Sequence, residues 1–82
     1  MPADRPGTVW SSTWVPTASP IAGFGPEGYA ACWVDLDPPA AARIQVLADG
    51  RAPVVGCRGR VVERTFDGRV VDLFVPDDPE AR

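Results

Sequence analysis

Residues 60–76, RVVERTFDGRVVDLFVP, form two runs rich in β-branched residues that are joined at Asp67 and Gly68. An Asp-Gly pair between such runs favours a two-residue type I′ turn, because both central residues need positive φ. The stretch therefore predicts a β-hairpin. Its turn sets three cross-strand pairs: Arg64 with Val71, Val62 with Leu73, and Val61 with Phe74. The same register places Glu63 opposite Asp72, a like-charge pair that costs stability, so a bulge that shifts the register is the alternative.

Three further β-rich runs precede the hairpin, at residues 8–15, 29–36 and 42–47, and proline and glycine separate them. Along residues 29–36 one alternating face is small and wholly apolar, so we expect it to lie in the core. That face consists of Ala30, Cys32, Val34 and Leu36. Along residues 42–47, Arg43 and Gln45 form a polar face that should meet solvent.

Residues 16–28 are too rich in proline, glycine and small residues for a regular element, and Ile21 and Phe24 are their only large apolar side chains. No stretch shows sustained helical periodicity. Five short strands suggest a small barrel, because closure removes the edges that invite aggregation. We therefore predict an all-β fold, a five-stranded Greek-key barrel of the OB type, with an SH3-like barrel as the alternative.

Length and composition limit the function further. A chain of 82 residues makes one small domain, which we place at residues 7–76 between an N-terminal tail (1–6) and an acidic C-terminal tail (77–82). All eight basic residues are arginine and the net charge is −3, which argues against general nucleic-acid binding but leaves room for one anionic ligand. The absence of a long apolar run or an N-terminal leader predicts no membrane span and a cytoplasmic location.

The two cysteines do not suggest chemistry. Cys32 and Cys57 are 25 positions apart, and the chain has no CxxC pair and no histidine, so we expect no metal and no cofactor. We expect two buried free thiols, although the sequence leaves a disulfide open. No nucleophile stands beside a base, so we predict no catalytic residue and no enzyme activity of the chain alone.

The N-terminal strand carries two tryptophans in the segment GTVWSSTWV, residues 7–15. Strand alternation predicts that Trp10 and Trp14 point to one side, where they would meet a hydrophobic core, a stacked nucleic acid or another protein. We expect barrel curvature to fold Trp10 inward. Trp14, next to the strand end and Pro16, is the better candidate for an interface.

Several of these segments together resemble a known family. Gly7, Val9, Ser11 and Thr13 in the first strand, Val34, Leu36 and Asp37 at the end of the second, and Gly56, Val61, Phe74 and Pro76 near the end of the chain form its pattern. The chain is similar over residues 7–76 to the OB-fold domain of the domain of unknown function 35 family, the acyl-CoA-associated OB-fold proteins. Many members also carry a zinc ribbon before the OB domain, and only six residues precede Gly7 here, so the resemblance implies the OB half alone and no inherited metal.

The resemblance implies an accessory subunit. Such domains associate with thiolase-like enzymes acting on acyl-CoA thioesters, including lyase complexes in which an aldolase shortens steroid side chains in lipid metabolism, and the chemistry belongs to the partner. We accordingly expect a hetero-oligomer with a thiolase-like subunit, possible contact with its acyl-CoA, and neither nucleic acid nor membrane as a partner. The alternative function is that of a single-stranded nucleic-acid-binding OB module.

Two sets of side chains are candidates for the binding site. Interfaces are enriched in aromatic residues, and the expected partner-binding residues are Trp14, Phe24, Tyr29 and Trp33. Arg58 and Arg60 could contact CoA phosphates or acidic groups of the partner, because guanidinium groups suit both. A solvated barrel exterior is the plainer account of these arginines.

Overall fold

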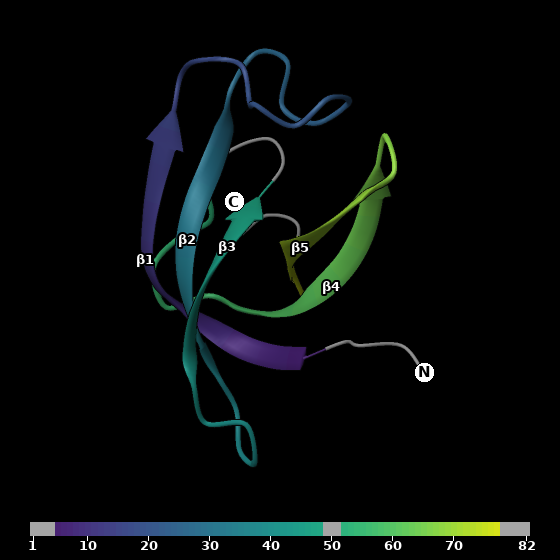
Figure 1. Ribbon diagram of the computed structural model, residues 1–82. Helices are drawn as coiled ribbons and strands as arrows, with labels where there is room; N and C mark the ends of the chain where they lie inside the picture. Colours follow the sequence, from purple (N-terminus) through teal and green to yellow (C-terminus); the bar gives the residue numbers. More distant parts are fainter. Residues whose placement is uncertain (1–4, 49–51, 78–82) are drawn as a thin grey trace.

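The computed structural model describes residues 5–48 and 52–77 as a single closed β-barrel with no helix (Figure 1). Its five strands are β1 (Arg5–Val15), β2 (Tyr29–Leu36), β3 (Arg43–Ala48), β4 (Arg58–Phe66) and β5 (Arg69–Pro76). They follow the order β1-β2-β3-β5-β4, and β1 pairs with β4 to close the barrel. All neighbouring strands are antiparallel except β3 and β5, which are parallel. This is the order of an OB-fold-like Greek-key barrel, and it confirms the predicted fold class.

The β4–β5 hairpin adopts the predicted register without a shift. Asp67 and Gly68 have φ values of 50° and 79°, as a type I′ turn requires, and the three predicted cross-strand pairs all form. Glu63 does stand opposite Asp72. The Nη2 atom of Arg5 lies 3.1 Å from Oδ1 of Asp72, so a cation from β1 offsets the like-charge pair and no bulge is needed.

The strand bounds differ from expectation mainly at the start of the chain. β2 spans the predicted residues, whereas β1 begins at Arg5 rather than at residue 8. Arg5 pairs with Val61 and Pro6 with Arg60, so these two residues belong to the barrel. The remainder of the expected N-terminal tail and the end of the C-terminal tail lie outside the described residues.

The main core fills the barrel interior. Its buried members come from all five strands: Val9, Ala30, Cys32, Val34, Leu36, Val46, Ala48, Val61 and Phe74. The predicted inner face of β2 is therefore confirmed. Gly59 lets β4 pass close to β5, because a Cβ at that position would lie 2.4 Å from the ring of Phe74. The aromatic ring covers the strand at this glycine and completes the core.

A second, smaller cluster lies beneath the loop of residues 16–28. Phe24 is only 2% exposed and packs with Val71 and Leu73 of β5. Its ring centroid lies 5.3 Å from that of Phe66 and 6.1 Å from that of Tyr29. The loop therefore carries its own buried anchor, which holds it against the barrel wall near the β4–β5 hairpin (Figure 1).

Candidate protein-binding surface

A β-bulge in β1 places its two tryptophans on different faces. Val9 pairs with Val34 and Ser11 pairs with Trp33, so the register gains one residue at Trp10. A bulge sets two residues against one, and here Trp10 and Ser11 both turn outward. Strand alternation then resumes with the opposite phase, and Trp14 pairs with the buried Ala30. The prediction that both rings point to one side is wrong because it assumed an unbroken period of two.

Trp10 is 51% exposed, so the prediction that it packs inward is also wrong. It lies on the outer face of β1 beside Trp33 of β2, which is 41% exposed. The guanidinium carbon of Arg43 sits 3.9 Å from the centroid of the Trp10 ring, a cation–π contact. We call the surface formed by Trp10, Trp33, Asp35 and Arg43 the tryptophan face.

The charges on the tryptophan face are paired with each other. Nε of Arg43 donates to Oδ1 of Asp35 at 2.6 Å, and Nη2 donates to Oδ2 at 3.2 Å. This hydrogen bonding lowers the pKa of Asp35 and raises the pKa of Arg43. The aspartate thus holds the guanidinium in its place over the Trp10 ring, and the surface presents two rings with no net charge.

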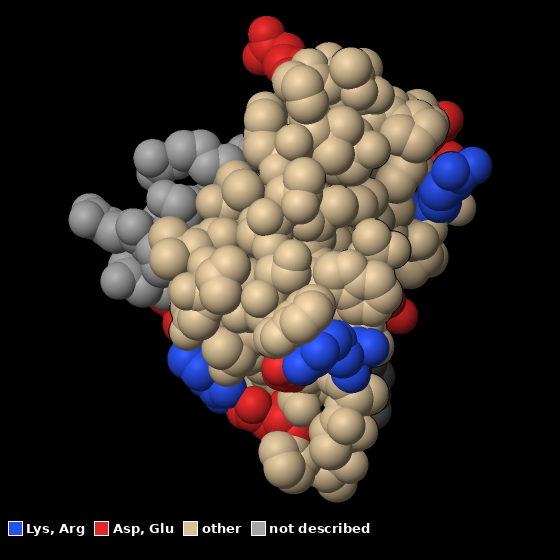
Figure 2. Space-filling view, turned by 90° about the vertical axis from the view of Figure 1, so that its left-hand side faces the viewer, with Lys and Arg blue, Asp and Glu red and all other residues tan. Residues whose placement is uncertain are grey.

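Uncharged residues cover much of the side of the molecule on which β1 lies. Figure 2 views this side, and its middle and upper part are uncharged, whereas side chains of both charges gather in its lower part. Gly56 donates its N–H to the carbonyl of Val9, and the N–H of Val9 donates to the carbonyl of Cys57. The adjoining Val54 and Val55 are both more than half exposed. Exposed apolar side chains therefore continue from the bulge at Trp10 to residues 54–57, the segment that hydrogen-bonds to Val9.

Trp14 occupies a different setting. Its ring lies against the backbone of Gly28, where a Cβ would approach ring carbon Cζ2 to 2.5 Å, and Gly28 has a φ of 136° that disfavours side chains. The ring is still 43% exposed. Trp14 is thus half packed at the end of β1, and its assignment to a partner contact stays a prediction.

The other aromatic residues predicted to bind a partner do not lie together on one surface. Phe24 was expected to touch a partner, but its burial in the second cluster makes it a structural anchor, which corrects that expectation. Tyr29 is half-buried against the same cluster. Of these three residues only Trp33 lies on the tryptophan face. The sequence did not predict the position of Trp10 on this face, because the bulge has no local sequence signal.

The predicted arginines lie on the exterior of β4. Nη1 and Nη2 of Arg58 donate to Oδ1 and Oδ2 of Asp37 at 2.8 and 2.5 Å, and Nη1 also donates to Oγ1 of Thr8 at 2.9 Å. This pairing lowers the pKa of Asp37 and raises that of Arg58. The fork of Arg58 is thus already engaged by a carboxylate. Arg60 is exposed and lies opposite Val75. Their contact with CoA phosphates or with a partner remains a prediction.

The cysteines are free, as expected. Cys32 is fully buried and Cys57 is half-buried rather than buried. Burial raises the pKa of both thiols. In Cys32 this effect is larger than the opposite effect of the hydrogen bond that its Sγ donates to Oγ of Ser12. A raised pKa disfavours the reactive thiolate, so neither cysteine has the environment of a nucleophile. Among the described residues, no three cysteine or carboxylate side chains gather as a metal site.

Comparison with known proteins identified no relative of this chain. No protein-family model matches the chain, and no curated protein or solved structure is significantly similar to it. The part of the chain described by the structure contains no helix that is long and apolar enough to cross a membrane. The tryptophan face and the sequence pattern of residues 7–76 are therefore the features of the chain that indicate a function.

Proposed function

We propose that the chain is a non-catalytic accessory subunit that binds a thiolase-like enzyme acting on acyl-CoA thioesters. The observation that carries the binding role is the outward pair of Trp10 and Trp33, two large rings about half exposed on one sheet face. Interfaces select tryptophan and arginine as their energetic centres, and exposed aromatic patches on small domains mark contact surfaces. The family resemblance of residues 7–76 is the reason for proposing acyl-CoA thioesters, and in particular steroid-derived ones, as the substrates of the partner enzyme.

The tryptophan face suits a protein better than a nucleic acid. Single-strand binders combine stacking rings with a basic groove that follows the phosphates. Here Arg43 is neutralised by Asp35, and Arg58 is neutralised by Asp37. The surface keeps its apolar area and its hydrogen-bonded rim but offers little net positive charge, and this combination supports a protein partner.

Co-expression with a candidate thiolase-like subunit tests the proposal. We expect one peak containing both chains in size-exclusion chromatography, and recovery of the partner's activity on an acyl-CoA thioester only when the small chain is present. Two separate peaks would overturn the proposal. Turnover by the isolated chain, or salt-dependent micromolar binding of a labelled oligonucleotide, would instead identify it as an enzyme or as the alternative OB module.

A further inference from the structure

A tight turn just before β4 carries two exposed valines. The N–H of Cys57 donates to the carbonyl of Val54 at 3.1 Å, and Gly56 has a φ of 92°. A hydrogen bond across four residues with a positive-φ glycine at the third position is the geometry of a type II β-turn. Val54 and Val55 are 55% and 60% exposed. We call residues 54–57 the valine turn.

The valine turn is held at both ends. Ala52 before it and Cys57 at its end pack against the main core, and Pro53 is buried. The N–H of Gly56 donates to the carbonyl of Val9 at 2.8 Å, and the N–H of Val9 donates to the carbonyl of Cys57 at 3.0 Å. The two valines therefore project from a fixed backbone, so little conformational entropy is lost when they bind.

The valine turn lies beside the tryptophan face. Its hydrogen bonds to Val9 place it along one edge of β1 at Trp10, whereas Trp33 lies along the other edge. Among the described residues, most of the exposed large hydrophobic side chains gather around this bulge, and the other two are Trp14 and Val70. The exposed apolar surface of the barrel is therefore concentrated in one place. Its members are Trp10, Trp33, Val54 and Val55.

The two tryptophans alone are too small for a stable interface. A tryptophan side chain offers at most about 250 Å², so the exposed parts of Trp10 and Trp33 supply about 230 Å² together. A stable protein–protein interface buries about 800 Å² on each partner. A partner that covers the tryptophan face must therefore also cover the surface next to it, and the valine turn is the exposed apolar part of that surface.

The chemistry of the valine turn favours a protein over a lipid surface or a second copy of the chain. Peripheral membrane binding combines apolar groups with unpaired cations, but residues 52–57 carry no charge and Arg58, which follows them, is paired with Asp37. A twofold interface sets one surface against itself, and two projecting turns do not interlock. The complement of a projecting, uncharged turn is a concave apolar pocket.

We propose that the valine turn inserts into an apolar pocket of the protein that covers the tryptophan face. The inference rests on the proposed function, because it takes a thiolase-like subunit as the partner. The pocket is lined by aliphatic or aromatic side chains and receives Val54 and Val55. The adjoining rings of Trp10 and Trp33 then lie on the rim of this pocket, so that both parts belong to one interface with an apolar centre.

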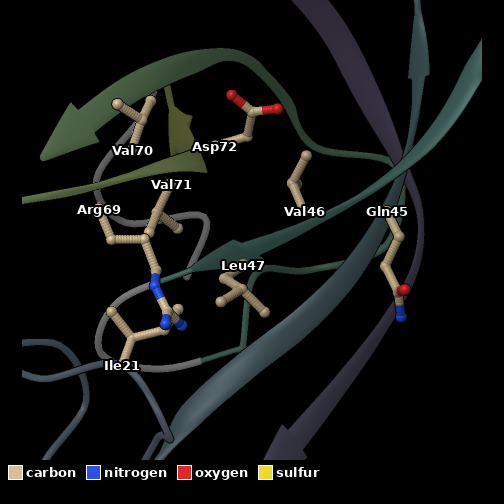
Figure 3. Close-up of a pocket in the computed structure, with 8 residues that line it drawn as sticks. All are labelled: Ile21, Gln45, Val46, Leu47, Arg69, Val70, Val71 and Asp72. Carbon is tan, nitrogen blue, oxygen red and sulfur yellow. The ribbon is translucent and has the colours of Figure 1, made fainter. Parts of the chain in front are cut away.

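The first test measures the affinity of the purified chain for the candidate thiolase-like subunit. The double variant Val54→Ser with Val55→Ser should weaken the complex about tenfold. Val70 provides the matched control, because it is 62% exposed and lies beside the hollow drawn in Figure 3, on a strand that does not pair with β1. Val70→Ser should bind as the parent does, within about twofold.

A pair of glycine variants tests the shape of the turn without changing its valines. Gly56 and Gly68 both have a positive φ, and a Cβ at either position would meet no atom within 4 Å. Alanine therefore strains both turns without a clash. Both variants should lower the melting temperature, but only Gly56→Ala should also weaken partner binding, by about fivefold.

Photochemical crosslinking identifies what occupies the valine turn. A benzoylphenylalanine in place of Val55 should crosslink to apolar residues of the thiolase-like subunit, whereas the same group in place of Val70 should not. If the parent chain forms no complex with that subunit, the proposed function fails and this inference fails with it.

Other outcomes overturn the inference alone. One is a complex that forms while the double valine variant binds as the parent does, and another is equal crosslinking from positions 55 and 70. The inference also fails if position 55 crosslinks to a second copy of the chain. It fails as well if the parent sediments with phosphatidylcholine vesicles and the double variant does not.

Discussion

Replacing Phe24 with alanine should destabilise the whole domain although the residue lies in a loop. The ring is 2% exposed and contacts Phe66, Tyr29, Val71 and Leu73. Loss of a buried phenylalanine commonly costs about 3–5 kcal/mol. An 82-residue domain has an unfolding free energy of about 4–12 kcal/mol, so the change removes a quarter of the stability or more.

Urea denaturation followed by tryptophan fluorescence measures this effect. With a slope near 1–1.5 kcal/mol per molar, typical of a small domain, a loss of about 3 kcal/mol lowers the midpoint by about 2 M or more. Phe24→Leu keeps most of the apolar volume and should cost less than about 1.5 kcal/mol. The exposed control Val70→Thr should change stability by no more than about 0.5 kcal/mol.

The reasoning fails if Phe24→Ala stays within about 0.5 kcal/mol of the parent. That result would mean that the second cluster contributes nothing and that Phe24 is available at the surface, as its assignment to a partner contact required. A reduced slope together with a normal midpoint would instead show that the loop detaches before the barrel unfolds.

Three other properties follow from the same contacts. The pKa values of Asp35 and Asp37 are lowered in the folded protein, so these two carboxylates stabilise the fold above the ordinary carboxyl pKa of about 4, and this stabilisation is lost as pH falls through the lower folded values. The double variant Asp35→Asn with Asp37→Asn should therefore flatten the acid limb of a plot of stability against pH. An unchanged acid limb would contradict the pairing. Iodoacetamide should modify half-buried Cys57 before fully buried Cys32 in mass spectra of the native protein, and the reverse order would refute the placement of Cys32. Gly28→Ala should cost at least about 1 kcal/mol because of its positive φ and the nearby Trp14 ring, and a melting temperature equal to that of the parent would contradict this geometry.

Local sequence signals predicted the parts of the fold that local chemistry determines. The Asp67-Gly68 turn fixes φ at two positions, and with them the whole hairpin register. The apolar alternation of β2 identified its buried face because one side of that strand packs in the barrel. In both cases the deciding residues are neighbours in sequence.

The missed features depend on partners distant in the sequence. The bulge at Trp10 is set by how β1 pairs with β2 and with the segment around Gly56, and nothing in residues 7–15 marks it. The pairing of Arg58 with Asp37 joins residues 21 positions apart. Phe24 looked like a free loop aromatic because the cluster that buries it comes from β5 and from the end of β4.

The candidate site was predicted only in part for the same reason. Trp33 was assigned to the outer face by strand alternation, and it lies there. Trp10 was assigned to the core by an argument from barrel curvature, yet one extra residue in the strand turns it outward beside Trp33. Its contact with Arg43 joins β1 to β3 across β2, and such a contact cannot be inferred without the strand order.

The affinity of the purified chain for its thiolase-like partner, measured for Trp10→Ala and for Trp33→Ala, tests the proposed role of the tryptophan face most directly. Interface tryptophans that act as energetic centres contribute about 2 kcal/mol or more, so each variant should weaken the complex about 30-fold. The exposed control Val70→Thr should bind as the parent does, within about twofold. If both tryptophan variants keep their fold and bind with an unchanged dissociation constant, the tryptophan face is not the surface that holds the partner.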